Sequence, residues 1–184
     1  MLARERRGAV AAAAPPDAAE RLAARFLHAF PQPPGTVVSG YMPIGDELDP
    51  RPLLAALAAA GCRLALPVVA GRGRPLSFRL WRPGDALAAR PMGLAEPGPD
   101  APTVDPDVLL VPLLAFDDGG RRIGYGAGYY DMTIAGLRAR RTVLAVGVAF
   151  EGQRVDRVPA GPWDALLDAV VTEAATRRFA PIRA

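Results

Sequence analysis

The segment from residue 108 to residue 131, VLLVPLLAFDDGGRRIGYGAGYYD, constrains the fold of this chain more than any other part of its sequence. Residues 108–116 are apolar throughout, a length that suits a strand buried on both faces and is too short to span a membrane. Strands of this kind occur mainly in parallel sheets that helices cover on both sides. The segment therefore predicts an α/β protein.

The residues after this strand have the composition of a turn and an anion-binding loop. Residues 117–120 read Asp-Asp-Gly-Gly, two arginines come next, and Gly124, Gly126 and Gly128 stand at alternate positions. Such glycines let backbone N–H groups approach a ligand, and a helix that began near 129–131 would direct its positive end at the same space. The pattern suits a phosphate chain. A solvated turn has the same composition, and the spacing is neither the P-loop nor the dinucleotide-binding fingerprint, so both interpretations stay open here.

Asp131, at the end of this segment, also has two interpretations. Aspartate is a favoured residue at helix N-caps, and it is equally a carboxylate that can face a metal ion. The spacing does not decide between them.

Composition narrows the classes of protein to be considered. A chain of 184 residues is expected to form a single domain, residues 1–184. All 22 basic residues are arginine, so any anion must be held by arginine or by backbone N–H groups, and the net charge of +3 argues against a nucleic-acid partner. Cys62 is the one cysteine, which predicts a buried thiol in a cytoplasmic protein. No stretch is apolar and long enough to cross a bilayer, so no membrane partner is expected.

Turn and cap signals divide the remainder into alternating helices and strands. We expect helices at 17–30, 50–60 and 132–140, and the end of an earlier helix within 1–16. We expect strands at 36–41, 63–69, 76–81, 143–150 and 169–172, a short piece near Leu87, and a proline-rich loop over 91–107. The spacing across 36–69 implies a parallel strand pair with a right-handed crossover. The loops 42–49, 117–131 and 150–164 would then emerge at one edge of the sheet, where ligands bind.

The ordered string VP-x-x-AFD-x-x-G-x-R-I-G-Y-G-x-G-Y-Y-D, within residues 111–131, resembles the signature of the 5-formyltetrahydrofolate cyclo-ligases, also called 5,10-methenyltetrahydrofolate synthetases. The resemblance extends over most of the chain and is weakest before Thr36. It implies a three-layer α/β/α sandwich with a mostly parallel central sheet, Rossmann-like and of the type found in sugar-phosphate isomerases and CoA-transferases. It also implies ATP as co-substrate, Mg²⁺ and a reduced formyl-folate substrate.

The resemblance implies that the glycine segment binds ATP. The residues concerned are Arg122, Ile123, Gly124, Tyr125, Gly126, Ala127, Gly128, Tyr129 and Tyr130. Arg122 and the glycine N–H groups would hold the phosphates, and the two adjacent tyrosines would line the pocket between nucleotide and folate, unless one belongs to the core. Arg122, Tyr130 and Asp131 are the implied catalytic residues. Asp131 and Asp164 would hold Mg²⁺, for which Asp168 is less suited.

The folate site implied by the resemblance comprises Met42, Glu47 and Met92. A carboxylate such as Glu47 can accept two hydrogen bonds from the amide-like edge of a pterin, and the thioether of Met92 can pack on a flat ring. Both have a simpler interpretation. Glu47 lies in an acidic loop before a helix that Asp49-Pro50 would start, and Met92 could anchor a plain loop.

Three positions depart from the family pattern. Trp163 stands where a histidine commonly precedes the aspartate, Ala127 replaces a lysine or glycine, and Met132 replaces a frequent arginine. One phosphate contact could therefore be missing at Ala127.

The largest departure is at the start. The family usually opens with a basic helix that reaches the ATP phosphates, and Arg4, Arg6 and Arg7 resemble only its last part. Two hypotheses follow: Met1 is an internal methionine of a longer product, or this variant binds ATP more weakly. Mass spectrometry of the native protein decides the first, which the detection of Met1 as N-terminus would exclude.

The implied activity is the ATP- and Mg²⁺-dependent cyclisation of 5-formyltetrahydrofolate to 5,10-methenyltetrahydrofolate, with release of ADP and phosphate. The substrate could carry a polyglutamate tail, and a monomer is expected. Two alternatives are a divergent member that binds nucleotide or folate without closing the ring, and a sugar-phosphate isomerase-like enzyme, since this fold hosts such activities.

Overall fold

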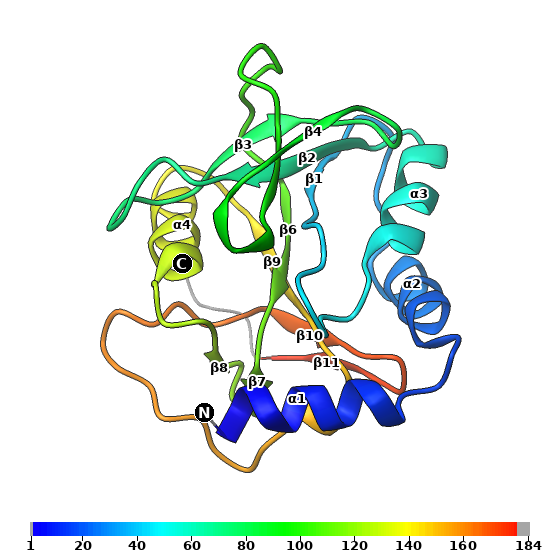
Figure 1. The fold of residues 1–184 in the computed structure, drawn as a ribbon, viewed down its shortest axis with the longest axis vertical. Helices are drawn as coiled ribbons and strands as arrows, with labels where there is room; N and C mark the ends of the chain where they lie inside the picture. The colour runs from blue at the N-terminus through cyan, green and yellow to red at the C-terminus, as the bar shows by residue number, and fades with distance from the viewer. Residues whose placement is uncertain (1, 180–184) are drawn as a thin grey trace.

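The computed structural model describes residues 2–179, apart from the side chains of Leu2 and Met92. Within them, helices alternate with strands (Figure 1). The α-helices are α1 Leu2–Ala13, α2 Ala18–Ala29, α3 Arg51–Ala59 and α4 Tyr129–Arg138, and the 3-10 helices are η1 Pro91–Gly93 and η2 Glu151–Gln153. The strands are β1 Val37–Ser39, β2 Arg63–Val68, β3 Ser77–Leu80, β4 Leu87–Ala89, β5 Ala95–Pro97, β6 Val108–Pro112, β7 Ala115–Phe116, β8 Arg122–Ile123, β9 Leu144–Val148, β10 Ala169–Val171 and β11 Thr176–Arg178. None of the described helices is both long and apolar enough to cross a membrane.

The central layer of the described residues is a seven-stranded sheet in the order β11-β10-β9-β6-β1-β2-β3. Strands β10, β9, β6, β1 and β2 are parallel, and the two edge strands, β3 and β11, are antiparallel to their neighbours. Val38 of β1 lies opposite Leu64 of β2 in a parallel pair. The predicted parallel pair joined by a helix is therefore confirmed.

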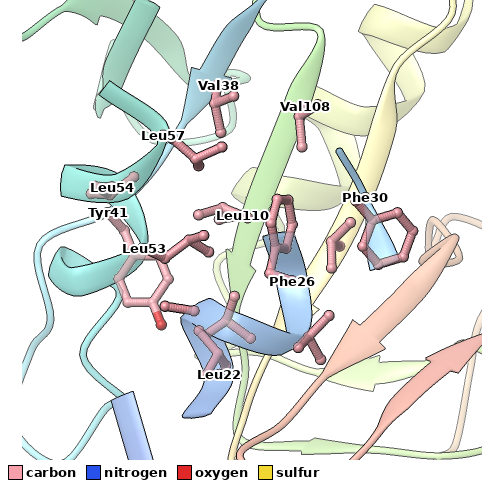
Figure 2. Packing of buried hydrophobic residues seen from close by; sticks show 14 of the residues in the cluster. Leu22, Phe26, Phe30, Val38, Tyr41, Leu53, Leu54, Leu57, Val108 and Leu110 are labelled. Carbon is pink, nitrogen blue, oxygen red and sulfur yellow. The ribbon is translucent and has the colours of Figure 1, made fainter. Parts of the chain in front are cut away.

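Alternate residues of β6 contribute to two separate cores. Val108 and Leu110 pack with α2 and α3, as Figure 2 shows, whereas Leu109 and Val111 pack on the opposite face with Ile134 of α4. Successive side chains of a strand point to opposite faces, so a strand buried on both sides requires an uninterrupted apolar run. The helix–sheet–helix arrangement confirms the expected three-layer α/β/α sandwich.

The ends of α2 and α3 follow local sequence signals with one difference. Gly61, just after α3, has a φ of +87°, a conformation that glycine adopts without steric cost. Asp17 lies at the N-cap of α2, but its carboxylate accepts a hydrogen bond from Arg21 at 2.8 Å and caps no helix N–H group. The helix thus lies within the predicted range 17–30, and Asp17 stands at its start without a capping bond.

The prediction of one strand over 108–116 is wrong. Strand β6 ends at Pro112, and β7 belongs to a separate two-stranded ladder with β8. Between them the chain leaves the main sheet, because the buried side-chain amide of Gln153 donates to the carbonyls of Leu113 and Leu114 at 2.7 and 3.2 Å. A side chain distant in sequence thus satisfies backbone groups that would otherwise pair in the sheet.

Two other expected boundaries change. Helix α4 begins at Tyr129, which confirms the start considered near 129–131 and extends the expected helix 132–140 towards its N-terminus, where Gly128 at the N-cap has a left-handed φ of +68°. The proline-rich segment 91–107 contains η1 and β5, and β5 pairs antiparallel with β4. Pro91 and Pro97 are tolerated because they lie at the ends of these short elements.

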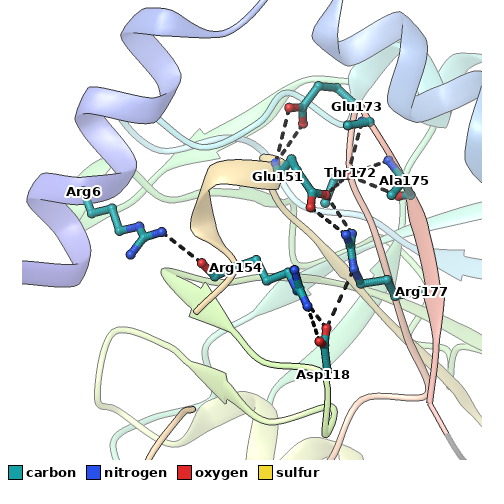
Figure 3. A network of polar contacts seen from close by, with 9 residues as sticks. Arg6, Asp118, Glu151, Arg154, Thr172, Glu173, Ala175 and Arg177 are labelled. Carbon is teal, nitrogen blue, oxygen red and sulfur yellow. Dashed lines mark hydrogen bonds and ion pairs between the residues drawn. The ribbon is translucent and has the colours of Figure 1, made fainter. Parts of the chain in front are cut away.

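A polar network joins α1 and the sheet edge to the turn after β7 (Figure 3). Arg154 pairs with Asp118, and Arg177 pairs with Glu151 at 2.6 Å and with Asp118 at 3.8 Å. Arg6 of α1 donates to the carbonyl of Arg154 at 2.9 Å. Helix α1 is thereby held across the end of the sheet where the parallel strands terminate (Figure 1).

Candidate functional site

A cleft of about 820 Å³ lies at the carboxyl ends of β1 and β6. These two neighbouring strands form the switch point of the sheet, because the chain proceeds outward from β1 to β2 and β3 and then returns to the other side of β1 as β6. Ligands of open α/β sheets bind at this place, and the volume suits a small-molecule site. The cleft is lined by Ala3, Arg4, Glu5, Gly45, Asp46, Leu114, Ile123, Gly124, Tyr125 and Gly126.

The three loops expected at this edge do converge. The Tyr125 hydroxyl donates to Glu47 Oε1 at 3.0 Å, which joins loop 117–131 to loop 42–49. The backbone N–H of Val158 donates to Asp117 Oδ2 at 3.0 Å, which joins loop 117–131 to loop 150–164. The loops converge because β1, β6 and β9 are parallel, so the segments that follow these strands emerge at the same edge of the sheet.

The glycine loop is bare on the side where a ligand would approach. A Cβ atom added at Gly124, Gly126 or Gly128 would meet nothing within 4 Å, and Ala127 between them is exposed. No side chain of the described residues caps the start of α4, so its first N–H groups keep their capacity to bind an anion. Gly126 has a φ of +88°, a conformation that requires glycine for low strain.

Arg122 and Asp131 form an ion pair with a distance of 2.6 Å. The Arg122 side chain is 5% exposed and also donates to the carbonyl of Ala165, so its guanidinium faces Asp131 rather than the cleft. Asp131 lies in the first turn of α4 while Gly128 occupies the N-cap, and its Oδ1 accepts from the Ala165 N–H at 3.1 Å. Of the two interpretations of Asp131, the structure thus excludes the helix cap.

Asp164 lies on the same side of the molecule as Asp131, since the residue after it contacts Asp131 directly. Asp164 itself is exposed, and its Oδ2 accepts from the Gly161 N–H at 2.8 Å. Within residues 2–179, no three His, Cys, Asp or Glu side chains are grouped as a protein-only metal site would require. Asp168 is engaged elsewhere, by the Ala145 N–H at 2.7 Å and by Arg138 at 2.9 Å.

Glu47 follows Asp46, which lines the cleft, and its own side chain is buried, with 4% exposed. Its Oε2 accepts from the Ile44 N–H at 2.9 Å, and its Oε1 accepts from Tyr125. Burial raises the pKa of the Glu47 carboxyl, an effect that these hydrogen bonds and the charge of Arg7 oppose. Asp46 is the contrasting neighbour: burial opposes its ionisation, but hydrogen bonding and charge from Arg7 hold its pKa below the ordinary value.

The other predicted binding residues lie around this centre. Tyr130 packs against the α4-side core, where burial raises the pKa of its hydroxyl and keeps it neutral, whereas Tyr129 is half-buried and its carbonyl accepts from Thr133 at 2.7 Å. Met42 packs against the core on the α2–α3 face. The backbone of Met92 lies in η1, but its side chain is outside the described part of the structure.

The three N-terminal arginines have separate positions. Arg4 lines the cleft, Arg6 contacts the backbone of η2 and the next residue, and Arg7 is buried against Asp46 and Glu47. Asp46 is not expected at the site from the sequence, and Arg7 is expected only as part of a basic helix near the phosphates, not beside Glu47. The available signal was an arginine-rich helix together with the adjacent acidic pair, but only the fold shows that they meet.

Fold and site together place this chain among the Rossmann-like α/β proteins that bind a small ligand at the switch point of the sheet. Comparison with known proteins then identifies the group. The model of the 5-formyltetrahydrofolate cyclo-ligase family matches residues 2–173, and the chain belongs to that family.

Individual relatives agree with this assignment. A 5-formyltetrahydrofolate cyclo-ligase of Mycolicibacterium smegmatis is 39% identical over 146 residues, covering 75% of this chain and 74% of the relative. That of Escherichia coli K12 is 34% identical over 177 residues, with 92% and 95% covered. The solved structure of Aquifex aeolicus 5,10-methenyltetrahydrofolate synthetase has a TM-score of 0.73 at 29% identity and covers 100% of this chain and 96% of its own. The chain is thus an enzyme of this family, and the expected fold type is confirmed.

Proposed function

We propose that this chain cyclises 5-formyltetrahydrofolate to 5,10-methenyltetrahydrofolate and couples the reaction to the conversion of ATP to ADP and phosphate. One observation carries the proposal. Gly124 and Gly126 of the bare glycine loop, Arg4 and Asp46 line one cleft at the switch point, α4 begins uncapped directly after the loop, and the buried Glu47 adjoins Asp46. This arrangement supports an anion-binding surface beside a carboxylate that could recognise a pterin.

The reaction needs ATP because the formyl oxygen is a poor leaving group. That oxygen attacks the γ-phosphorus, and ADP departs. N10 of the substrate then attacks the formyl carbon and loses its proton, and the formyl oxygen leaves as part of inorganic phosphate. The work of the protein is to position the two substrates and to stabilise charge, as in other phosphoryl transfers.

The phosphate end of the cleft is formed by backbone and helix dipole. N–H groups of Gly124, Gly126 and the first turn of α4 would bind the phosphate oxygens, with Arg4 facing them from α1. Arg122 supports this end indirectly in our proposal, because its ion pair fixes the orientation of Asp131. Ala127 offers no side-chain donor, so the binding relies on the backbone.

The carboxylates beside this loop fit Mg²⁺ as a partner of the phosphates. Oδ1 of Asp131 is engaged by Arg122 and Ala165, and Oδ2 of Asp164 is engaged by Gly161, but the second oxygen of each has no hydrogen-bond partner among the described residues. Mg²⁺ commonly takes one or two carboxylates together with phosphate oxygens and water. Asp131 and Asp164 would hold the ion, which when bound neutralises the charge of the transferring phosphoryl group.

The folate end is formed by the loop after β1. Glu47 has both oxygens oriented by protein donors, so its remaining lone pairs point in defined directions for the donors of a pterin ring. Tyr125, 49% exposed, extends an aromatic face at the mouth of the same cleft. Because the glycine loop of the phosphate end contacts Glu47 through Tyr125, the two ends adjoin and suit a formyl group held against a phosphate.

The proposal includes the setting in which the enzyme works. Cys62 is buried, and burial raises the pKa of its thiol, which suits a structural cysteine in the reducing cytoplasm. We propose a monomer there, acting on 5-formyltetrahydrofolate with or without a polyglutamate tail.

A single spectrophotometric assay tests the function. The purified chain is mixed with 5-formyltetrahydrofolate, and the absorbance of methenyl-folate is followed with Mg-ATP, with ATP plus EDTA, and without nucleotide. Product is expected only with Mg-ATP, with one ADP formed per ring closed. Absence of product from a folded protein at saturating substrates would refute the proposal and favour a member that binds without catalysis.

A further inference from the structure

Arg7 is a buried charged side chain in a helix otherwise suited to the surface. It is 1% exposed, although the neighbouring Arg4 and Arg6 on α1 are exposed. Burial of a guanidinium is unfavourable unless the group is paired and hydrogen-bonded. Its contacts are therefore informative about what the helix is required to hold.

The contacts of Arg7 join three parts of the site. Its Nε donates to Asp46 Oδ1 at 3.0 Å, and Nη2 donates to the same oxygen. Its Nη1 lies 3.5 Å from Glu47 Oε1, the oxygen that also accepts from Tyr125. The guanidinium carbon lies 5.4 Å from the centroid of the Tyr125 ring, within the range of a cation–π contact. Helix α1, the loop after β1 and the glycine loop thus share one side chain.

We propose that Arg7 is a positioning residue for the folate end of the site: its guanidinium holds the Glu47 carboxylate and the Tyr125 ring in the geometry that receives the pterin. This inference rests on the proposed function and assigns the N-terminal helix a second role besides facing the phosphates. Arg4 and Arg7 are one helical turn apart, so the same turn of α1 contacts both ends of the cleft.

The charges around Glu47 make the expected effect specific. Arg7 is the cation that faces Glu47, and Asp46 pairs with the same guanidinium. The other titratable groups that interact with the Glu47 carboxyl are the hydroxyls of Tyr125, Tyr41 and Tyr130. The tyrosine hydroxyls are neutral at ordinary pH, because burial raises the pKa of each. Removal of Arg7 therefore leaves Glu47 without its cation and favours the protonated carboxyl.

The test compares Arg7→Met with Arg6→Met, a matched control on the same helix whose hydrogen bonds within residues 2–179 go to backbone carbonyls of the segment after β9. Arg7→Met is expected to raise the folate KM at least about tenfold while the ATP KM changes much less. The acid limb of kcat/KM for folate should move to higher pH. Arg6→Met should leave both KM values and this limb unchanged. If Arg7→Met raises the two KM values equally, or leaves the folate KM unchanged, the inference is overturned.

Two further measurements keep the inference testable whatever the variant or the activity does. If Arg7→Met does not fold, Arg7→Lys keeps the charge but lacks the forked geometry, and an equal rise in both KM values again contradicts a positioning role. Glutamate labelled with ¹³C at its carboxyl reports Glu47 directly, the signal being assigned with Glu47→Gln. An unchanged Glu47 titration in Arg7→Met would overturn the inference even if the wild-type chain formed no methenyl-folate, an outcome that would refute only the proposed function.

Discussion

At the scale of single residues, the function of each aspartate depends on how many of its oxygens the protein already uses. Asp117 accepts from the N–H groups of Gly119, Arg121 and Val158, which leaves it a structural role. Asp131 keeps one oxygen with no partner among the described residues. Residue type alone does not separate such cases, because the difference lies in backbone donors supplied by other segments.

Asp131→Asn tests the proposed metal-binding carboxylate. The amide keeps the size of the side chain but loses the charge that Mg²⁺ and Arg122 require, so kcat/KM is expected to fall by about a hundredfold or more. Steady-state kinetics and circular dichroism measure the effect and confirm folding. The control is Asp105→Asn, whose carboxylate pairs with Arg140 on the exposed surface at 2.8 Å. Activity of Asp131→Asn near that of the control would remove Asp131 from the metal site.

Glu47→Gln tests the folate contact and its pH dependence. Loss of a charged acceptor should raise the folate KM about tenfold or more and change the ATP KM less. Because burial raises the pKa of Glu47 above the ordinary 4.5, folate binding by the wild type should weaken as the pH falls through that raised value. Calorimetric titrations from about pH 4, near the ordinary carboxyl value, up to about pH 8 check this. A folate affinity that depends on pH equally in both proteins would contradict the role of Glu47.

At the scale of elements, the glycine loop and the turn before it have different requirements. The turn needs Asp117 to bind its backbone, and Gly120 with a φ of +77° lies against the Leu167 carbonyl, so this part is tightly packed. The loop after β8 is open, and its glycines face empty space. One segment is therefore determined by packing within the protein and the other, in our proposal, by the approach of a ligand.

Gly124→Ala separates these two requirements. Gly124 has no left-handed φ and an added Cβ meets no protein atom, so stability should not change, but the methyl group would project into the proposed phosphate position. The ATP KM is expected to rise about tenfold. The control is Gly136→Ala in α4, equally open, which should stabilise the helix by about 0.5–1 kcal/mol with unchanged kinetics. Unaltered ATP binding in Gly124→Ala would argue against a phosphate cradle at this loop.

Asp117→Asn tests the turn through the pH dependence of stability. Burial opposes ionisation of Asp117, but hydrogen bonds from three backbone N–H groups and the charge of Arg121 outweigh it and lower the pKa below 3.8. A lowered pKa means that Asp117 stabilises the fold above pH 3.8 and that this contribution is lost as the pH falls through the lower, folded-state value.

At neutral pH the variant should be less stable by about 3 kcal/mol in urea unfolding. The difference between variant and wild type should shrink as the pH drops below the ordinary aspartate value. A difference that stays constant down to the acid transition would show that the charge of Asp117 is not what stabilises the turn.

At the scale of the whole molecule, the site exists because the strand order of the sheet reverses between β1 and β6. The reversal separates the loops after these two strands and opens the cleft between them. The central strands must also approach the covering layers closely. A Cβ at Gly147 of β9 would lie 2.8 Å from side-chain atoms of Leu113, Leu167 and Val170.

Gly147→Ala tests this packing at a distance from the chemistry. The added methyl group has no space, so the protein should lose about 1–3 kcal/mol of stability. Thermal and urea unfolding measure the loss, and both KM values should stay near those of the wild type at a temperature where the variant is folded. A stability equal to that of the wild type would show that the layers can separate without cost.

The sequence by itself determined the layered α/β fold, the parallel strand pair and the edge at which the loops converge. Apolar runs, their length and the glycine and proline positions are local properties, and burial on two faces follows from them. The end of β6 and the partners of Arg122 could not be predicted, because Gln153 and Ala165 decide them through contacts between segments distant in the sequence.

The tertiary structure alone decided how the charges are distributed. Arg4, Arg6 and Arg7 are the same residue type within four positions of one helix. Arg4 lines the cleft, Arg6 donates to backbone carbonyls, and Arg7 is buried with Asp46 and Glu47. A charge acquires its role from the groups that approach it and from the water that is excluded around it. The hydrogen-bond partners of Arg7 lie 39 and 40 residues away in the chain, and those of Arg6 lie 146 and 148 residues away, separations that only folding closes.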